Sequence, residues 1–200
     1  MPHVNVLFLN EFLRSPAVVG AVAPSSRRLA AAITVGVPGR GDPVVVELGP
    51  GTGAFTEEIQ RRLGGRGRHL AVEINPTMAR AVATRCDGVE VIEGDAAALP
   101  ELLAGRGVGA VDVVISGLPW AVFPADHQRA VLDAVTTVLR PTGAFATFSY
   151  AHARVLPPAR AFRRRLAAAF EEVVAGRTVW RNLPPALVLH ARRPRAHGHA

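Results

Sequence analysis

Two periods of apolar residues alternate along most of the chain. Short runs rich in valine, isoleucine and leucine are typical of buried strands, and they occur at 44–48, 69–73, 89–92, 111–115, 143–149, 172–180 and 186–191. Segments with an apolar residue every three or four positions predict helices at 55–64, 76–86, 96–104, 126–139 and 158–169. Strands that alternate with helices in this way predict an α/β fold built on a doubly wound parallel sheet.

The last two predicted strands have no helix between them. Only Asn182-Leu-Pro-Pro185 separates them, and a parallel crossover needs a dozen residues or more. We therefore expect a seven-stranded sheet whose last strand runs antiparallel to its neighbours.

The first 40 residues have a different pattern. Residues 4–14 place apolar side chains at 4, 7, 8 and 12, which predicts a short amphipathic helix. Ser26 is a suitable N-cap for a second helix through Ile33, and the prolines and glycines of 38–43 mark a break. The predicted organisation is an N-terminal helical extension at 1–40, a core domain at 41–193 and a mobile tail at 194–200.

The first strand of the core domain leads into a glycine-rich turn. The sequence Val44-Val-Val-Glu-Leu-Gly-Pro-Gly-Thr-Gly-Ala-Phe-Thr56 predicts a buried strand, a tight turn and a helix N-terminus. Glycine lets the backbone approach a ligand closely and take positive φ. We interpret Gly49, Gly51 and Gly53 as a ligand-binding loop, although their spacing also fits a dinucleotide-binding turn.

Three carboxylates around this turn narrow the choice of ligand. Glu47 precedes the glycines, and Glu57 and Glu58 lie in the first turn of the helix that follows. A dinucleotide would place its pyrophosphate at this helix N-terminus, where the carboxylates would repel it. They favour a ligand with a cationic end and no phosphate, such as the amino-acid part of S-adenosylmethionine (AdoMet). Alternatively, Glu57 and Glu58 only complement the helix dipole.

Charge and cysteine content limit which binding partners and which cellular compartment are expected. The formal net charge is +7 and all basic residues are arginine, and a basic surface favours nucleic acid or an anionic membrane. Cys86 is the only cysteine, so the chain has no disulfide framework and no cysteine-based metal site, which fits a reducing compartment. No apolar run reaches membrane-spanning length, and the N-terminus lacks a basic n-region. We expect a cytoplasmic protein without a bound metal.

The order of these motifs resembles the class I AdoMet-dependent methyltransferases. Their E-x-G-x-G-x-G loop is matched by Glu47, Gly49, Gly51 and Gly53. The resemblance implies a Rossmann-like methyltransferase fold with AdoMet as the cofactor. It also implies that the acid that ends the second strand, here Glu73, holds the ribose hydroxyls. The neighbouring positions that we assign to the same cofactor site are Thr52, Ile74, Ala96 and Ser116.

The resemblance extends to the adenine and to the substrate side. An Asp after the third strand, here Asp95, contacts the adenine amino group in the family. The fourth strand runs into Ser116-Gly-Leu-Pro-Trp120, where amino-methylating relatives have Asn/Asp-x-Pro-aromatic. Gly117 stands at the Asn position, which disfavours a flat exocyclic amine as the substrate. We expect Trp120 to present its ring face to an ammonium group, or else only to close the pocket.

A second resemblance covers nearly the whole chain. The segments Phe12–Pro16, Val19–Ser26, Ser116–Trp120, Phe148–Tyr150 and Asn182–Ala186 are similar to bacterial phospholipid N-methyltransferases, whose core relatives are the ribosomal RNA adenine dimethylases. This resemblance implies stepwise methylation of phosphatidylethanolamine. It also implies peripheral attachment to an anionic membrane through the helix at 4–14, with no stable nucleic-acid partner.

The amine must lose a proton before it can accept a methyl group. Tyr150, His152 and His127 are the candidates for accepting or relaying this proton, and Arg154 or Arg181 could hold the lipid phosphate. Three other hypotheses remain: an RNA adenine methyltransferase, a soluble methyltransferase of a small metabolite, and a membrane- or partner-binding module with a degenerate cofactor site.

Overall fold

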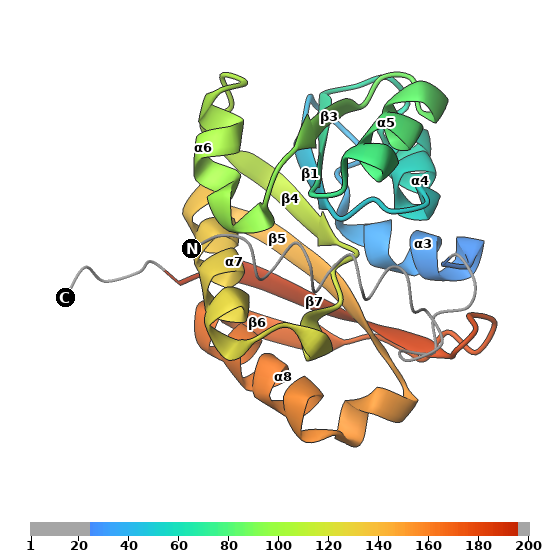
Figure 1. Ribbon diagram of the computed structural model, residues 1–200, viewed down its shortest axis with the longest axis vertical. Coiled ribbons are helices and arrows are strands. Elements are labelled where there is room, and N and C mark those ends of the chain that lie inside the picture. Colours follow the sequence, from blue (N-terminus) through green and yellow to red (C-terminus); the bar gives the residue numbers. More distant parts are fainter. Residues whose placement is uncertain (1–24, 196–200) are drawn as a thin grey trace.

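A single sheet in the order β3-β2-β1-β4-β5-β7-β6 organises the chain (Figure 1). The structure is a computed structural model in which residues 25–195 are described. Its strands are β1 (Val44–Leu48), β2 (Arg68–Glu73), β3 (Glu90–Glu93), β4 (Val111–Ser116), β5 (Leu139–Tyr150), β6 (Phe170–Ala175) and β7 (Ala186–Pro194). Strands β1 to β5 pair in parallel, whereas β7 is antiparallel to both β5 and β6. The predicted seven-stranded sheet with an antiparallel last strand is confirmed.

Helices cover both faces of the sheet. The α-helices are α3 (Arg27–Ile33), α4 (Ala54–Leu63), α5 (Pro76–Arg85), α6 (Leu99–Ala104), α7 (Ala125–Val138) and α8 (Pro157–Ala169). Short 3-10 turns are η1 (Thr34–Gly36), η2 (Ala96–Ala98), η3 (Trp120–Val122) and η4 (His152–Val155). Helices α3, α4 and α5 lie on one side, and α6, α7 and α8 lie on the other (Figure 1). The predicted doubly wound arrangement is therefore confirmed.

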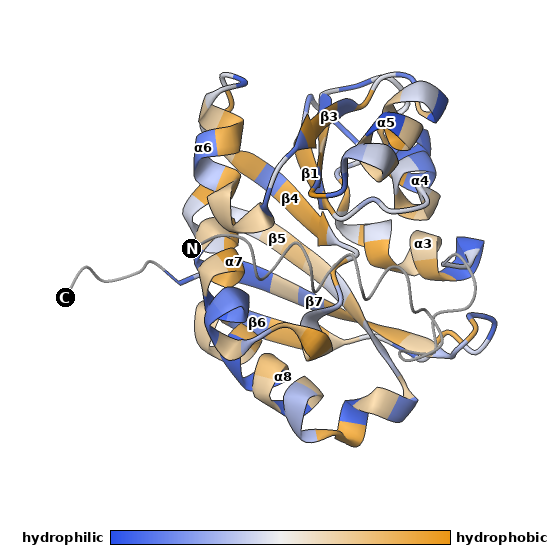
Figure 2. Ribbon diagram, viewed as in Figure 1, coloured by the Kyte–Doolittle hydropathy of each residue, from blue (hydrophilic) through white to orange (hydrophobic). Residues whose placement is uncertain are grey.

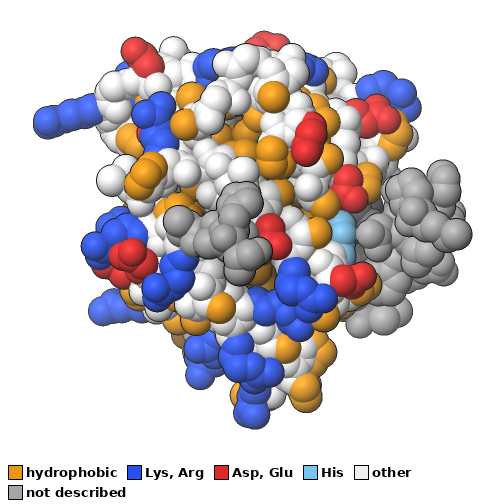
Figure 3. All heavy atoms as spheres, turned by 90° about the vertical axis from the view of Figure 1, so that its left-hand side faces the viewer, with side chains coloured by type: hydrophobic (Ala, Val, Ile, Leu, Met, Phe, Trp, Pro, Cys, Tyr) orange, Lys and Arg blue, Asp and Glu red, His pale blue; other side chains and the backbone are white. Residues whose placement is uncertain are grey.

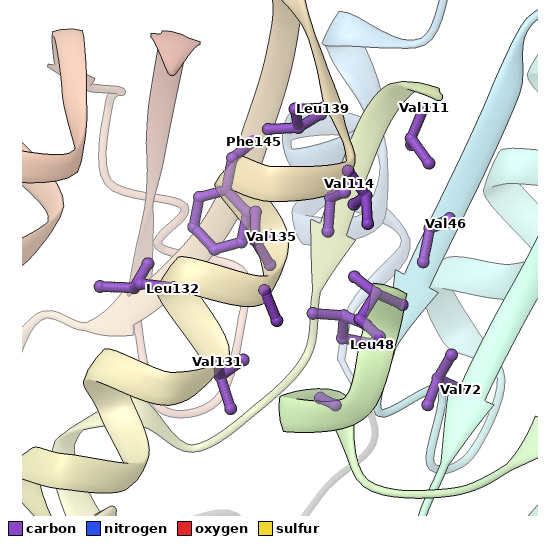
Figure 4. Close-up of a cluster of buried hydrophobic side chains, with 14 of the residues drawn as sticks. Val46, Leu48, Val72, Val111, Val114, Val131, Leu132, Val135, Leu139 and Phe145 are labelled. Atoms are coloured by element: carbon purple, nitrogen blue, oxygen red, sulfur yellow. The ribbon is translucent and has the colours of Figure 1, made fainter. Parts of the chain in front are cut away.

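Successive side chains along each strand point to opposite faces of the sheet, and they pack into two separate hydrophobic cores. Val46 and Leu48 of β1 pack with α6, α7 and α8, whereas Val45 packs with α3 and α4. Figure 4 shows the first of these cores, in which Val131 and Val135 of α7 lie opposite the side chains of β1 and β4. Because the inner strands are covered on both faces, they are hydrophobic along nearly their whole length (Figure 2).

Three predicted boundaries were wrong. Strand β6 ends at Ala175 rather than at 180, because the chain turns away after the Gly176 amide donates to the Val188 carbonyl. The helix expected at 96–104 is divided into η2 and α6, since the Asp95 carboxylate caps a separate first turn. Strand β5 begins at Leu139, before a register shift opposite β4. This shift explains why the apolar pattern of β5 becomes regular only near residue 143.

Of the predictions for the first 40 residues, only those from residue 25 onward can be compared with the structure. The helix that begins after the Ser26 cap is confirmed, since the Ser26 hydroxyl accepts from the Leu29 amide in the first turn of α3. The amphipathic helix expected at 4–14 and most of the tail expected at 194–200 lie outside the described residues. Within the described part of the chain, no helix is long and apolar enough to cross a membrane.

An aromatic cluster fixes the segment after β4 to the core. The Trp120 indole stacks on Phe162 of α8, with ring centroids 4.6 Å apart, and meets the edge of Phe145 of β5. Its Nε1 donates to the Ser116 hydroxyl over 3.0 Å, and the residue is only 3% exposed. The structure thus places Trp120 in the core. Its ring face is covered by Phe162 and is not presented to an ammonium group as the sequence suggested.

Replacing Trp120 with alanine should lower the free energy of unfolding by about 3–5 kcal/mol, the usual cost of truncating a buried tryptophan. Chemical denaturation followed by circular dichroism measures this loss. Trp180, which is 77% exposed, provides the matched control, and its alanine variant should stay within about 0.5 kcal/mol of the wild type. Equal losses at the two positions would contradict the core role of Trp120.

Candidate active site

The turn after β1 is shaped for close approach by a ligand. Gly49, Gly51 and Gly53 all have positive φ, at 68°, 51° and 79°. The Gly49 amide donates to the Val72 carbonyl at the end of β2, which anchors the turn to the neighbouring strand. At Gly51, a Cβ atom would meet no atom within 4 Å. Open space therefore lies beside the middle of this turn, where a cofactor would be held.

Glu73 ends β2 directly beside this turn. Its Oε2 accepts from the Gly51 amide at 3.3 Å and its Oε1 accepts from the Asn75 amide at 3.0 Å. The residue is 4% exposed, and burial raises the pKa of its carboxyl group. The nearby Glu47 carboxylate adds to this rise, whereas the backbone donors, including Ile74, oppose it. An ionised carboxylate has about four lone-pair sites, so acceptor capacity remains for ligand hydroxyls.

Glu47 lies beneath the turn, on the face covered by α4. Its Oε2 accepts from the Thr56 hydroxyl at 2.8 Å and lies 3.3 Å from His69 Nε2. The contact with His69 is electrostatic, because its alignment is too poor for a hydrogen bond. Glu47 Oε1 is buried and has no donor among the described residues. A cationic ligand group or a water molecule would satisfy this oxygen.

The proton position on His69 follows from Gln60 of α4. The Gln60 side-chain nitrogen donates to the Gly88 carbonyl at 3.1 Å, which fixes the orientation of the amide because a carbonyl can only accept. The same nitrogen lies 2.9 Å from His69 Nδ1, so Nδ1 accepts and the ring proton is on Nε2. The protonated ring nitrogen is therefore the one nearer Glu47, and its positive partial charge lies 3.3 Å from the buried carboxylate without forming a hydrogen bond.

Asp95 reaches the same edge of the sheet from β3. The Gly94 amide donates to the Glu73 carbonyl at 3.0 Å, which keeps the loop after β3 beside the end of β2. Asp95 Oδ1 accepts from the Ala97 amide, and His127 Nε2 of α7 lies 4.0 Å from the same oxygen. Ala96 follows at the start of η2 and is buried. The structure thus brings the predicted cofactor residues of β1, β2 and β3 together.

The turn after β4 packs closely on the turn after β1, through backbone at Gly117 and through the Leu118 side chain at Gly49. The Gly117 amide donates to the Leu48 carbonyl at 2.8 Å, and a Cβ atom at Gly117 would lie 2.6 Å from the Gly49 carbonyl oxygen. The buried Ser116 hydroxyl accepts from the Leu118 amide and the Trp120 indole. Ser116 therefore holds the turn in place, and no side chain fits at the next position.

The predicted proton acceptors fall in two places. Tyr150 ends β5, and its ring stacks on His152 of η4 with centroids 5.9 Å apart and an interplanar angle of 11°. Burial raises the pKa of the Tyr150 phenol, whereas His152 is exposed. His127 instead lies beside Asp95, which follows β3, and three other strands separate β3 from β5 in the sheet. Tyr150 and His152 therefore form one pair, and His127 belongs to the cofactor side.

His69 and Gln60 were not identified as site residues from the sequence. Both are separated from Glu47 along the chain, so spacing gave no indication of their contact with it. One signal was available, because His69 is a polar residue inside an otherwise apolar predicted strand. A polar side chain that is buried in a parallel sheet needs a partner, and the ligand-binding turn was the nearest place to seek one.

Comparison with known proteins identifies the family. Residues 45–143 match the family described as "Methyltransferase domain". A curated relative, ornithine lipid N-methyltransferase from Singulisphaera acidiphila, is 37% identical over 142 residues, which cover 70% of this chain and 74% of the relative. The chain belongs to the class I AdoMet-dependent methyltransferases.

Solved structures show the same fold. This methyltransferase is similar to an O-methyltransferase family protein from Burkholderia thailandensis, with a TM-score of 0.64 and 20% identity. That match covers 86% of this chain and 57% of the other. Human Methyltransferase-like protein 13 in complex with S-adenosylhomocysteine (SAH) has the same TM-score and identity, over 87% of this chain and 84% of that protein.

The residues of this methyltransferase fit AdoMet. Glu73 retains acceptor capacity for ribose hydroxyls, Glu47 has a buried oxygen without a donor, and Gly51 leaves open space between them. Asp95 lies at the next strand end, where it would meet the adenine. Among residues 25–195, no group of three or more His, Cys, Asp or Glu side chains could hold a metal ion.

Substitution of Gly117 should disturb both turns at once. Alanine or asparagine there would force the Gly49 carbonyl to move, and such overpacking costs about 1–3 kcal/mol. We expect a lower melting temperature and weaker AdoMet binding, measured by calorimetry. Gly105→Ala is the control, because its Cβ atom would make ordinary contacts at 3.6 Å. Wild-type affinity in both Gly117 variants would show that the two turns are independent.

AdoMet affinity should fall below neutral pH because of Glu73. A raised pKa means that this carboxyl group gains its proton at a higher pH than an ordinary glutamate as the pH falls. Protonation removes acceptor capacity from the site. Dissociation constants measured by calorimetry between pH 8 and pH 5 should therefore rise toward the acid end.

Glu73→Gln is the matched control for this pH dependence. It should bind AdoMet more weakly by about 1–3 kcal/mol at neutral pH, with a flatter pH profile than the wild type. A profile as steep as that of the wild type would assign the titration to another group.

Proposed function

We propose that this methyltransferase transfers methyl groups to the amine of a lipid head group, with phosphatidylethanolamine as the expected substrate. The curated relative supports a lipid amine, because it is named for N-methylation of ornithine lipid. The segments that resemble phospholipid N-methyltransferases support phosphatidylethanolamine in particular.

The observation that carries this proposal within the structure is the backbone contact at Gly117. Recognition of a planar exocyclic amine requires a side-chain acceptor at this position, and the Gly49 carbonyl leaves no room for one. A tetrahedral alkyl amine has no such requirement. The same contact therefore favours a lipid amine over an adenine base of RNA.

The chain's own residues then have to hold the amine and take its proton. When bound, AdoMet supplies a methyl group on a positively charged sulfur. The amine must be neutral to form the new bond, so its proton must pass to a group nearby. We assign the role of proton acceptor to His152. Tyr150 would orient the amine through a hydrogen bond, because burial raises the pKa of its phenol and keeps the phenol protonated. Trp120 contributes by fixing the segment after β4 to the core.

The membrane surface is the place where such a substrate is met. We propose that the enzyme binds peripherally to the cytoplasmic face of a membrane through basic and apolar groups. The high arginine content and the net charge of +7 support attraction to anionic lipid. Neither nucleic acid nor a metal ion has a part in this proposal.

Methyl transfer from labelled AdoMet is the direct test. The protein is incubated separately with vesicles containing phosphatidylethanolamine, with RNA and with a metabolite extract. We expect label in mono-, di- and trimethylated lipid, resolved by thin-layer chromatography, and none in RNA. Label found only in the metabolite fraction would show that the substrate is a small soluble molecule and not a lipid.

Two variants test the assignment of roles in the same assay. His152→Ala should lower kcat by about 100-fold or more, the usual contribution of a general base, while AdoMet affinity stays unchanged. Tyr150→Phe should have a smaller effect on kcat. Full activity of His152→Ala would move the proton acceptor elsewhere, without affecting the identity of the substrate.

A further inference from the structure

The loop between β6 and β7 exposes large apolar side chains to solvent. Trp180 and Leu183 lie in this loop, residues 176–185, and are 77% and 74% exposed. They are the two most exposed large hydrophobic residues of the described chain. Figure 2 shows hydrophobic and hydrophilic residues side by side in this loop, at the right-hand end of the molecule. Exposure of this kind usually marks a contact surface.

This loop lies at the same edge of the sheet as the active site. Ala186 begins β7 opposite Tyr150 at the end of β5, and the Ala151 amide donates to the Pro185 carbonyl at 2.8 Å. Strands β1, β4 and β5 all end at this edge, because they run in parallel. The cofactor residues occupy the ends of β1, β2 and β3. The loop therefore occupies the other half of the edge, next to Tyr150 and His152.

Two segments of the chain, one that contains helix α8 and one that contains this loop, are basic in sequence. Residues 151–169 and 175–185 contain no Asp or Glu and hold Arg154, Arg160, Arg163, Arg164, Arg165, Arg177 and Arg181. Arginine side chains also gather at the lower end of the surface in Figure 3, which shows the side of the molecule turned away from this loop. Glu171 and Glu172 lie at the far end of β6, where they pair with Arg193.

Helix α3 adds two more arginines to this surface. The Ser26 amide donates to the Asn182 side chain at 2.9 Å, which fixes the start of α3 against the loop. Arg27 and Arg28 follow directly and are exposed. Neither they nor Arg177 and Arg181 form an ion pair with any residue in the described part of the chain.

We propose that loop 176–185, flanked by Arg27 and Arg28, is a docking surface for anionic lipid bilayers. Tryptophan and leucine at its tip suit the boundary between head groups and acyl chains, and arginines around them suit anionic head groups. This assignment rests on the proposed lipid substrate. It places the membrane at the β5–β7 half of the edge, so that a head group meets Tyr150 while AdoMet occupies the opposite half.

Vesicle binding by the full chain tests this surface without any methyl transfer. The probes are vesicles of phosphatidylcholine with phosphatidylglycerol, and pure phosphatidylcholine as the neutral comparison. We expect co-sedimentation with the anionic vesicles, weakened by high salt. Brominated lipid should quench Trp180 fluorescence, whereas the buried Trp120 is shielded. Trp180→Phe should bind almost as the wild type does and lose most of the quenching.

Matched pairs of variants locate the contact. The variant Trp180→Glu/Leu183→Glu should weaken binding by about tenfold or more. Val35→Glu is the control: Val35 lies in η1 and is 62% exposed, and its substitution should have no effect. The variant Arg177→Glu/Arg181→Glu should also bind anionic vesicles about tenfold more weakly or worse. The variant Arg40→Glu/Arg106→Glu makes the same change of charge at the opposite edge of the sheet and should lose much less affinity.

The outcomes separate this surface from the proposed function. Wild-type binding by the Trp180/Leu183 and Arg177/Arg181 variants would overturn the docking surface, even if the enzyme methylates lipid. If the enzyme methylates no lipid but vesicle binding is lost only in the loop variants, the proposed lipid substrate is wrong and the proposed docking surface stands. Equal losses of vesicle affinity in the loop variants and their controls would show that only the net charge matters, and would contradict the proposed docking surface.

Discussion

The backbone contact between the turns after β1 and β4 sets the geometry of the whole active-site edge. Gly117 and Gly49 approach so closely that neither turn can move without the other. The separation of the two turns is set by the hydrogen bond from the Gly117 amide to the Leu48 carbonyl and by the packing of the Leu118 side chain at Gly49. Methyl transfer requires two reacting atoms to be held in line within a few tenths of an ångström, and a contact of this kind supplies that rigidity.

The two halves of this edge differ in chemistry. Around β1, β2 and β3 the groups are carboxylates that are buried or hydrogen-bonded, and they suit a ligand with hydroxyl and ammonium donors. Beyond β5 the groups are arginines and exposed apolar side chains. A substrate that is partly anionic and partly apolar would be repelled by the first half and attracted by the second. The division therefore orients the substrate before any specific contact forms.

The sequence was most informative where one local rule decides the outcome. Alternating strands and helices predicted the sheet, and the short link between its last two strands predicted that the last one runs antiparallel. Glu73 and Asp95 could be placed because the resemblance to class I methyltransferases implies one acid at the end of the second strand and another after the third. Trp120 was misplaced because an aromatic residue after a strand suits a pocket wall or a core equally well, and only the stacking on Phe162 decides. The pairing of His69 with Glu47 joins two strands and a helix, so no local pattern could reveal it.

The Asn182 side chain has a consequence for how this protein forms. It accepts from the Ser26 amide and donates to the Pro184 carbonyl, although Ser26 and Asn182 are 156 positions apart. During synthesis, the start of α3 leaves the ribosome long before its partner exists. The hydrogen bond that ties the start of this helix to the loop between β6 and β7 can therefore form only after residue 182 has been made. Contacts between residues so far apart in sequence slow folding.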